Sequence, residues 1–219
     1  NYLGGEYSIE TEHKSDNSFV SVSQLREPKV LGAIKNWKFL RRPNKTQGFW
    51  DKINSLSDSE RGGSTWTIDL AKIAAELGFK VEFYSKSLEV NPENFALDFY
   101  NRETGGFDSS KNKLDKIIGR CKALSVHLEE KSFGLEELLS KINEDCLAIV
   151  LLDWYRLFDM EGYQGHFVPI VGYDEKNVYV NNPDFRKPVK DFAISKEKFD
   201  EARRALGTDE DVILVYRKI

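Results

Sequence analysis

The residues best suited to chemistry in this sequence are a histidine that opens one short apolar run and an asparagine that closes the next. The runs 164–173 and 178–182 are rich in Val, Ile, Tyr and Phe and are separated by a polar turn at 174–177. This pattern predicts an antiparallel hairpin. His166 and Asn182 then lie side by side at its open end. An imidazole held by an amide oxygen is the base and the orienter of a nucleophilic triad.

The same two residues also have a reading without chemistry. A histidine beside a glycine at the start of a strand is often a half-buried residue with no catalytic role, and Asn-Pro commonly ends a strand. The pair is therefore a hypothesis, and its support must come from the rest of the chain.

Hydrophobic periodicity indicates the elements that position this hairpin. Helices are predicted over residues 29–42, 66–77, 111–121, 132–142 and 195–206, and further strands over 19–23, 80–84, 123–128, 146–152 and 212–216. Ser64 and Thr65 are the expected cap of the second helix, and Gly78 its stop. Helices come early and strands cluster late, so the expected class is α+β, with an antiparallel sheet packed against an N-terminal helical part.

Length, composition and charge limit the number of domains and the classes of partner that we expect. The chain has 219 residues, of which 40% are hydrophobic and 31% charged. This length predicts one domain over residues 19–219, preceded by a polar arm over residues 1–18. The net charge of -4 disfavours a nucleic-acid partner. No apolar run is long enough to predict a membrane span.

Cysteines and histidines do not form a ligand pattern. Cys121 and Cys146 lack Cys-x-x-Cys spacing, which argues against a disulfide framework and favours a reducing, cytoplasmic location. His13, His127 and His166 are scattered along the chain. We therefore expect no metal site and no cofactor.

Three separated segments carry a resemblance to a known family. They are the hairpin, the stretch Ser-Thr-Trp-Thr-Ile-Asp-Leu-Ala at 64–71 and the run 199–211 with Gly-Thr-Asp-Glu-Asp near its end. Together they resemble the guanylyl cyclase domain-containing protein family of eukaryotes, over about residues 19–219. That family is similar to papain-like cysteine peptidases related to bacteriocin-processing peptidases. The resemblance implies a papain-like fold.

The resemblance also implies a site. The family pattern has a catalytic Cys at the start of the first core helix, a Gln just before it for the oxyanion hole, and the His and Asn of the late hairpin. These positions correspond here to Gln24, His166 and Asn182, while Val30 stands where the Cys is expected. A valine has no ionisable proton, so the triad route to covalent catalysis is closed at this position. Cys121 and Cys146 lie in apolar surroundings, which favours inert packing for both.

Several functions follow from these observations. The first is a catalytically inactive papain-like domain that binds a peptide or protein partner in the former active-site cleft. The alternative is an active enzyme, either a hydrolase that uses another nucleophile or a guanylyl cyclase that makes cyclic GMP from GTP. A third is a structural module of a longer polypeptide, with the arm in the cleft. The best acidic cluster, at 209–211, is expected to be a solvated turn.

Overall fold

The structure of this chain is a computed structural model that describes residues 20–21, 65–182 and 189–216. The predicted arm at 1–18, the predicted helix at 29–42, Gln24 and Val30 lie outside the described residues. The strands are β1 (Val20–Ser21), β2 (Lys80–Ser85), β3 (His127–Glu130), β4 (Cys146–Asp153), β5 (Gly165–Tyr173), β6 (Asn177–Asn182), β7 (Val189–Ser195) and β8 (Val212–Tyr216).

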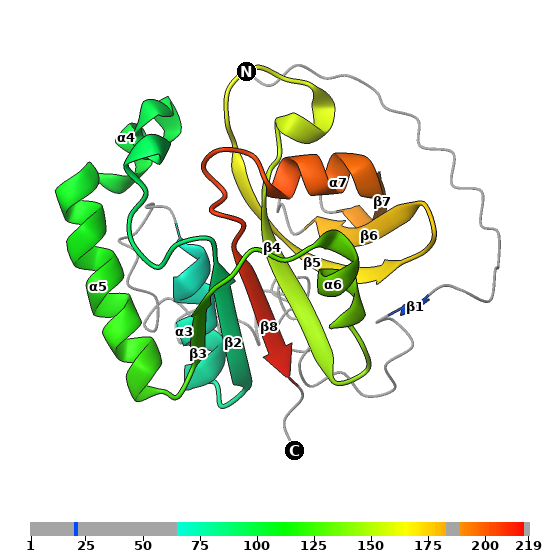
Figure 1. The fold of residues 1–219 in the computed structure, drawn as a ribbon, viewed down its shortest axis with the longest axis horizontal. Helices are drawn as coiled ribbons and strands as arrows, with labels where there is room; N and C mark the ends of the chain where they lie inside the picture. The colour runs from blue at the N-terminus through cyan, green and yellow to red at the C-terminus, as the bar shows by residue number, and fades with distance from the viewer. Residues whose placement is uncertain (1–19, 22–64, 183–188, 217–219) are drawn as a thin grey trace, which may run out of the picture.

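One twisted sheet joins these strands in the order β3-β2-β8-β4-β5-β6-β7 (Figure 1). Every pair is antiparallel except β2 and β3, which run parallel. Strand β5 pairs with β4 over residues 165–169 and with β1 at Gly172 and Tyr173. The predicted α+β class is confirmed, and the parallel β2–β3 pair is the exception to the antiparallel prediction.

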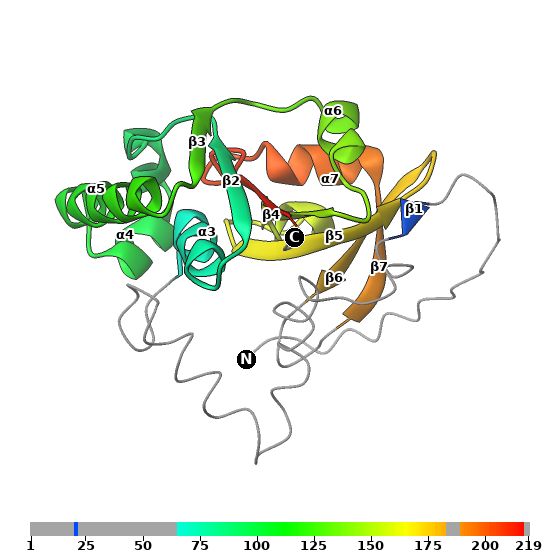
Figure 2. The same ribbon diagram turned by 90° about the horizontal axis from the view of Figure 1, so that it is seen from below.

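The described helices are α3 (Thr67–Glu76), α4 (Asp98–Thr104), α5 (Phe107–Ala123), α6 (Leu135–Ser140) and α7 (Lys196–Arg203), with the 3-10 turns η2 (Pro92–Ala96) and η3 (Arg156–Phe158). Helices α3, α4 and α5 gather at the β2–β3 end, whereas α6 and α7 lie beside β4 to β7 (Figure 2). Described helices thus alternate with strands along the chain.

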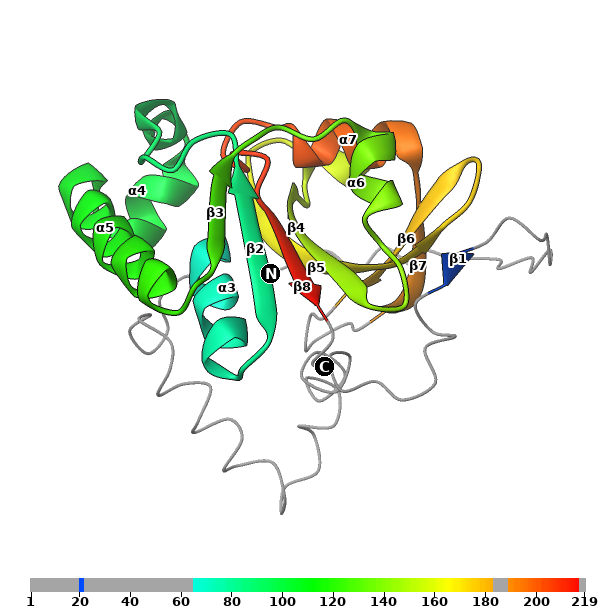
Figure 3. The ribbon, with the colours of Figure 1, turned by 60° about the horizontal axis from the view of Figure 1, so that its bottom comes forward.

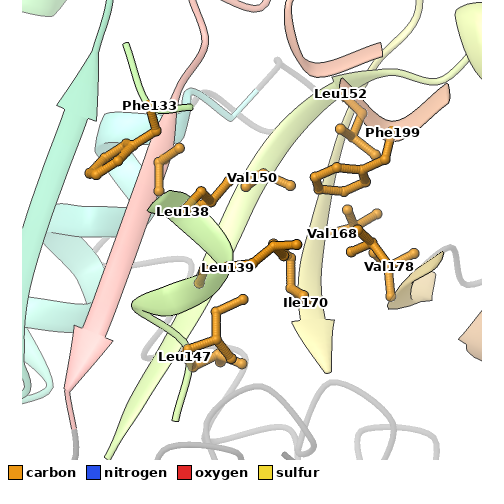
Figure 4. Close-up of a cluster of buried hydrophobic side chains, with 14 of the residues drawn as sticks. Phe133, Leu138, Leu139, Leu147, Val150, Leu152, Val168, Ile170, Val178 and Phe199 are labelled. Atoms are coloured by element: carbon orange, nitrogen blue, oxygen red, sulfur yellow. The ribbon is translucent and has the colours of Figure 1, made fainter. Parts of the chain in front are cut away.

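Two hydrophobic cores hold the layers together. The first lies between β4, β5 and β6 and the helices α6 and α7, and its side chains converge in Figure 4. The second lies between α3, α5 and the strands β2 and β8 (Figure 3). The two cores lie on opposite faces of the sheet, and all but one of the residues of β4 are buried. This explains why its sequence is a continuous apolar run instead of an alternating one.

Local boundaries differ from the prediction where tertiary contacts decide them. Helix α3 begins after Trp66, whose side chain makes no capping bond, so Thr65 is not at the cap position; Ser64 lies outside the described residues. Helix α5 extends to Ala123, and Ser125 adopts φ 58°, so the strand expected at 123–128 begins only at His127. Strand β7 was not predicted, because its Lys and Asp interrupt the apolar pattern.

Among the described helices, none combines the length and the apolar composition needed to cross a bilayer.

A glycine beside the C-terminal end of α7 allows three segments to meet. Gly207 has φ 94°. Its carbonyl oxygen accepts hydrogen bonds from the hydroxyls of Tyr100 at 2.5 Å and Tyr163 at 2.6 Å. A Cβ at this position would lie 2.7 Å from Cδ1 of Leu97 and 2.9 Å from Cε2 of Tyr163. Both the backbone conformation and the space therefore require glycine here.

We predict that Gly207→Ala destabilises the fold by about 1–3 kcal/mol, because it adds backbone strain and a clash with Tyr163. Urea denaturation measures the change in the free energy of unfolding. The matched control is Gly119→Ala in α5, where a Cβ meets no atom within 4 Å. That change should stabilise the helix by up to about 1 kcal/mol. Equal effects of the two substitutions would contradict the account.

Candidate functional site

A histidine–asparagine pair lies at the open end of the β5–β6 hairpin. His166 is the second residue of β5, and Asn182 is the last residue of β6. Nε2 of His166 lies 2.8 Å from Oδ1 of Asn182. Since the amide oxygen only accepts, Nε2 carries the proton and Nδ1 carries the lone pair. This is the tautomer that a general base needs.

An indole ring covers the imidazole. The ring centroids of Trp154 and His166 are 4.7 Å apart, with an angle of 60° between the planes. Trp154 begins the loop between β4 and β5, and its backbone N–H donates to the carbonyl of Gln164 at 2.7 Å. The loop therefore returns to β5 directly beside the histidine. Contact with the indole and the bond to Asn182 limit rotation of the imidazole from two sides.

A buried carboxylate closes this loop. Asp153 is only 6% exposed, and its Oδ1 accepts from the backbone N–H of Tyr155 at 3.1 Å and of Gln164 at 3.0 Å. One side chain thus ties together the two ends of the loop that carries Trp154. The aromatic side chains of this loop differ in their surroundings. Trp154 does pack inward, while Phe158 remains exposed.

Neither cysteine lies near this pair. Cys146 is opposite Tyr216 in the sheet, whereas Leu152, six residues further along β4, is opposite His166. Six residues of strand span about 20 Å. Cys121 belongs to the core on the other side of the sheet. Burial raises the pKa of Cys121 to about 12 and that of Cys146 to about 11, so neither thiol is a thiolate at neutral pH.

The structure therefore brings together two of the four predicted site residues, His166 and Asn182. Gln24 and Val30 lie outside the described residues, so their positions relative to the pair stay predictions. Sequence reasoning did not identify Trp154 or Asp153 as site residues. The only available signal was their place immediately after a buried strand that pairs with the strand of the histidine.

The acidic turn at 209–211 is not solvated as expected. Asp209 accepts hydrogen bonds from Nδ2 of Asn94 at 2.7 Å and Nδ2 of Asn91 at 3.3 Å. Glu210 accepts from Nη1 of Arg204 at 3.0 Å. Asp211 has its pKa raised to about 7, first by burial and then by the charge of Asp209. The expectation failed because η2 and β2, distant in sequence, enclose this turn.

Two of these carboxylates line a cavity of about 310 Å³. Asp209 and Asp211 form part of its wall, and Leu151, Gly165 and Phe167 contribute from β4 and β5. Side chains of a strand alternate between faces, so the neighbours of His166 face the cavity while His166 faces the opposite side. The cavity and the histidine–asparagine pair are therefore two separate places on one strand.

Comparison with known proteins finds a matching family model and similar proteins. A family model described as "Guanylylate cyclase" matches residues 39–215. Guanylyl cyclase 1 of Arabidopsis thaliana is 23% identical over 180 residues, which cover 74% of this chain. The chain spans 64% of that relative's own length. A C39-like peptidase of Bacillus anthracis is 21% identical with a TM-score of 0.31, over 40% of this chain and 48% of that one. At this TM-score the likeness carries no conclusion about fold or activity.

We predict that Asn182→Ala releases the tautomer of His166. Nitrogen-15 spectra of the imidazole should show the Nε2–H form in the native chain and a mixture of tautomers in the variant, because the acceptor that selects this form is gone. The control is Asn181→Ala, since Oδ1 of Asn181 accepts from the backbone of Asp191 at 3.0 Å. An unchanged tautomer in Asn182→Ala would contradict the role given to the amide.

The raised pKa of Asp211 predicts a pH dependence of stability. The native group titrates near 7 and the unfolded one near 3.8, so the native state binds more protons between these values. Stability from this group is therefore highest at low pH and is lost as pH rises towards 7, with a slope of at most about 1.4 kcal/mol per pH unit. Urea unfolding at pH 5 and pH 8 measures this loss as a difference in the free energy of unfolding. In Asp211→Asn the contribution of this group to that difference should be absent. Asp108→Asn, at an exposed position of α5, should keep it.

Proposed function

We propose a function for this chain from one premise, which is that it belongs to the family described as guanylylate cyclase. The proposal is a papain-like domain without its nucleophile, in which the former active-site cleft binds a peptide or protein segment and does not cleave it. The observation that carries it is the 2.8 Å contact between His166 and Asn182 beneath the indole of Trp154.

This arrangement has the parts of a general base and of the residue that orients it. The imidazole has its proton on the nitrogen that faces Asn182, so Nδ1 is the atom that would take a proton from a thiol. We infer that Val30 occupies the position of that thiol. A valine supplies no proton and no lone pair, so a peptide carbonyl bound beside it meets no nucleophile. Binding then remains without covalent catalysis.

Apolar surface beside the pair supports the binding part of the proposal. Trp154 packs 5.6 Å from Phe158 and 6.0 Å from Phe192, measured between ring centroids. Phe158 and Met160 are 40% and 49% exposed. Exposed aromatic and Met side chains next to a polar group suit an apolar peptide side chain and the peptide backbone that carries it.

The remaining parts of the proposal concern the domain bounds, the cellular compartment and the class of partner. We propose one domain over residues 19–219 with the arm at 1–18 preceding it. Cys121 and Cys146 are both buried free thiols, which supports a reducing, cytoplasmic compartment. The acidic net charge supports a partner other than nucleic acid.

Restoring the thiol tests the proposal. We predict that Val30→Cys becomes reactive towards an epoxysuccinyl peptide at neutral pH, because the imidazole of His166 lowers the pKa of the new thiol. Mass spectrometry of the intact chain should show one adduct, located at position 30. The native chain should remain unlabelled, since its two cysteines are buried with raised pKa values.

The matched control combines Val30→Cys with His166→Ala. Without the imidazole, labelling should slow by roughly 10²-fold or more, the usual range for loss of a positioned base. Equal labelling with and without His166 would place position 30 away from the pair, and the cleft proposed here would be wrong.

Formation of cyclic GMP is the second candidate function. The observation in its favour is the name of the relative, guanylyl cyclase 1. Incubation of the chain with GTP and either Mg²⁺ or Mn²⁺, followed by mass spectrometry of the products, separates the two candidates. We predict no cyclic GMP above a heat-denatured control. Formation that increases with protein concentration would favour the cyclase and count against the binding domain.

A further inference from the structure

The cavity on the other face of β5 has two walls of different chemistry. Its apolar wall includes the rings of Phe83, Phe95 and Phe99. Its polar wall includes Asp211, Asp209 and Asn94. A volume of about 310 Å³ is at the lower end of the range for small-molecule sites, and it suits a ligand with a single ring.

The polar wall has a buried hydrogen-bond acceptor that lacks a donor. Asn94 is only 2% exposed, and its Nδ2 donates to Asp209, but its Oδ1 is buried without a hydrogen-bond partner. Thr67 is 3% exposed, and its hydroxyl donates to Asp211, so its Oγ1 keeps a lone pair that can accept a further hydrogen bond. A buried acceptor without a donor costs about 1–3 kcal/mol, so each one needs an explanation.

The charge of this wall also favours a ligand, and specifically one with a positive charge. Asp211 and Asp209 are close enough for the charge of one to raise the pKa of the other. The remaining charged residues of the lining are Glu89, Arg102 and Glu103. Carboxylates therefore outnumber cations around the cavity, and a bound positive charge would relieve the repulsion between the two aspartates.

We propose that this cavity binds a small organic cation with an aromatic body, such as an arylamidine or an arylalkylamine. Its N–H groups donate to Asp211, to Oδ1 of Asn94 and to Oγ1 of Thr67, while its ring packs among the phenylalanines. A cation supplies a donor for Oδ1 of Asn94 and a positive charge beside the two aspartates. The site is independent of His166 and of the function proposed above.

Benzamidine is the probe for this proposal, with benzamide and benzoate as matched ligands of the same size. Isothermal titration of the full chain at pH 8 should give saturable binding of benzamidine. Benzamide should bind at least tenfold more weakly, because it has no positive charge, and benzoate should not bind. Equal affinities for benzamidine and benzamide, or no saturable binding of benzamidine up to 20 mM (roughly the weakest affinity worth calling a site), would overturn the proposal.

Variants and spectra locate the site. Asp211→Asn should weaken benzamidine binding at least tenfold, whereas Asp108→Asn removes the same charge from the exposed start of α5 and should leave binding unchanged. In nitrogen-15 spectra of the native chain, the side-chain amide signals of Asn91 and Asn94 should shift on titration. Binding that leaves those signals still, or that survives Asp211→Asn unchanged, would show a site elsewhere and refute the assignment. The ligand series and the spectra use the native chain, so they decide the question even if a variant does not fold.

Discussion

The register of β5 between its two neighbours is the constraint on which both polar sites depend. Val168 and Ile170 are fully buried in the larger core, and His166 shares their face because side chains of a strand repeat with a period of two. Gly165 and Phe167 consequently face the cavity. A slip of one residue would exchange these faces and expose the core residues. Burial of two aliphatic side chains thus fixes the direction in which the histidine points.

Buried carboxylates serve two different purposes on this scaffold. Asp153 accepts two backbone N–H groups and so acts as a clamp for the loop that carries Trp154. Asp211 has a second carboxylate nearby, and its pKa rises to about 7. The cost of burying a charge depends on the donors around it. A carboxylate that accepts backbone N–H groups stabilises a loop, whereas one that lies beside a second carboxylate in a cavity suggests a cationic ligand.

Family membership and site geometry give different kinds of information about function. The family's description names nucleotide chemistry. The pair of His166 and Asn182 is instead the arrangement of a base held for proton transfer, which by itself does not specify a substrate. Fold and family do not fix chemistry, and chemistry resides in the groups around a site. The contact between His166 and Asn182 and the lining of the cavity therefore carry more information about this chain than the family description does.

The sequence by itself determined the hairpin, the α+β class and the closeness of His166 to Asn182, because short apolar runs around a polar turn allow few other pairings. It did not reveal β7, whose polar residues hide its pattern, nor the contact between Trp154 and His166. It misjudged the turn at 209–211, because local polarity suggested solvent. Only the tertiary structure decided these points, since η2 and β2 enclose Asp209 and Asp211 from more than 100 residues away in the chain. Burial is a property of the neighbours that the fold supplies, and no local pattern of residues encodes it.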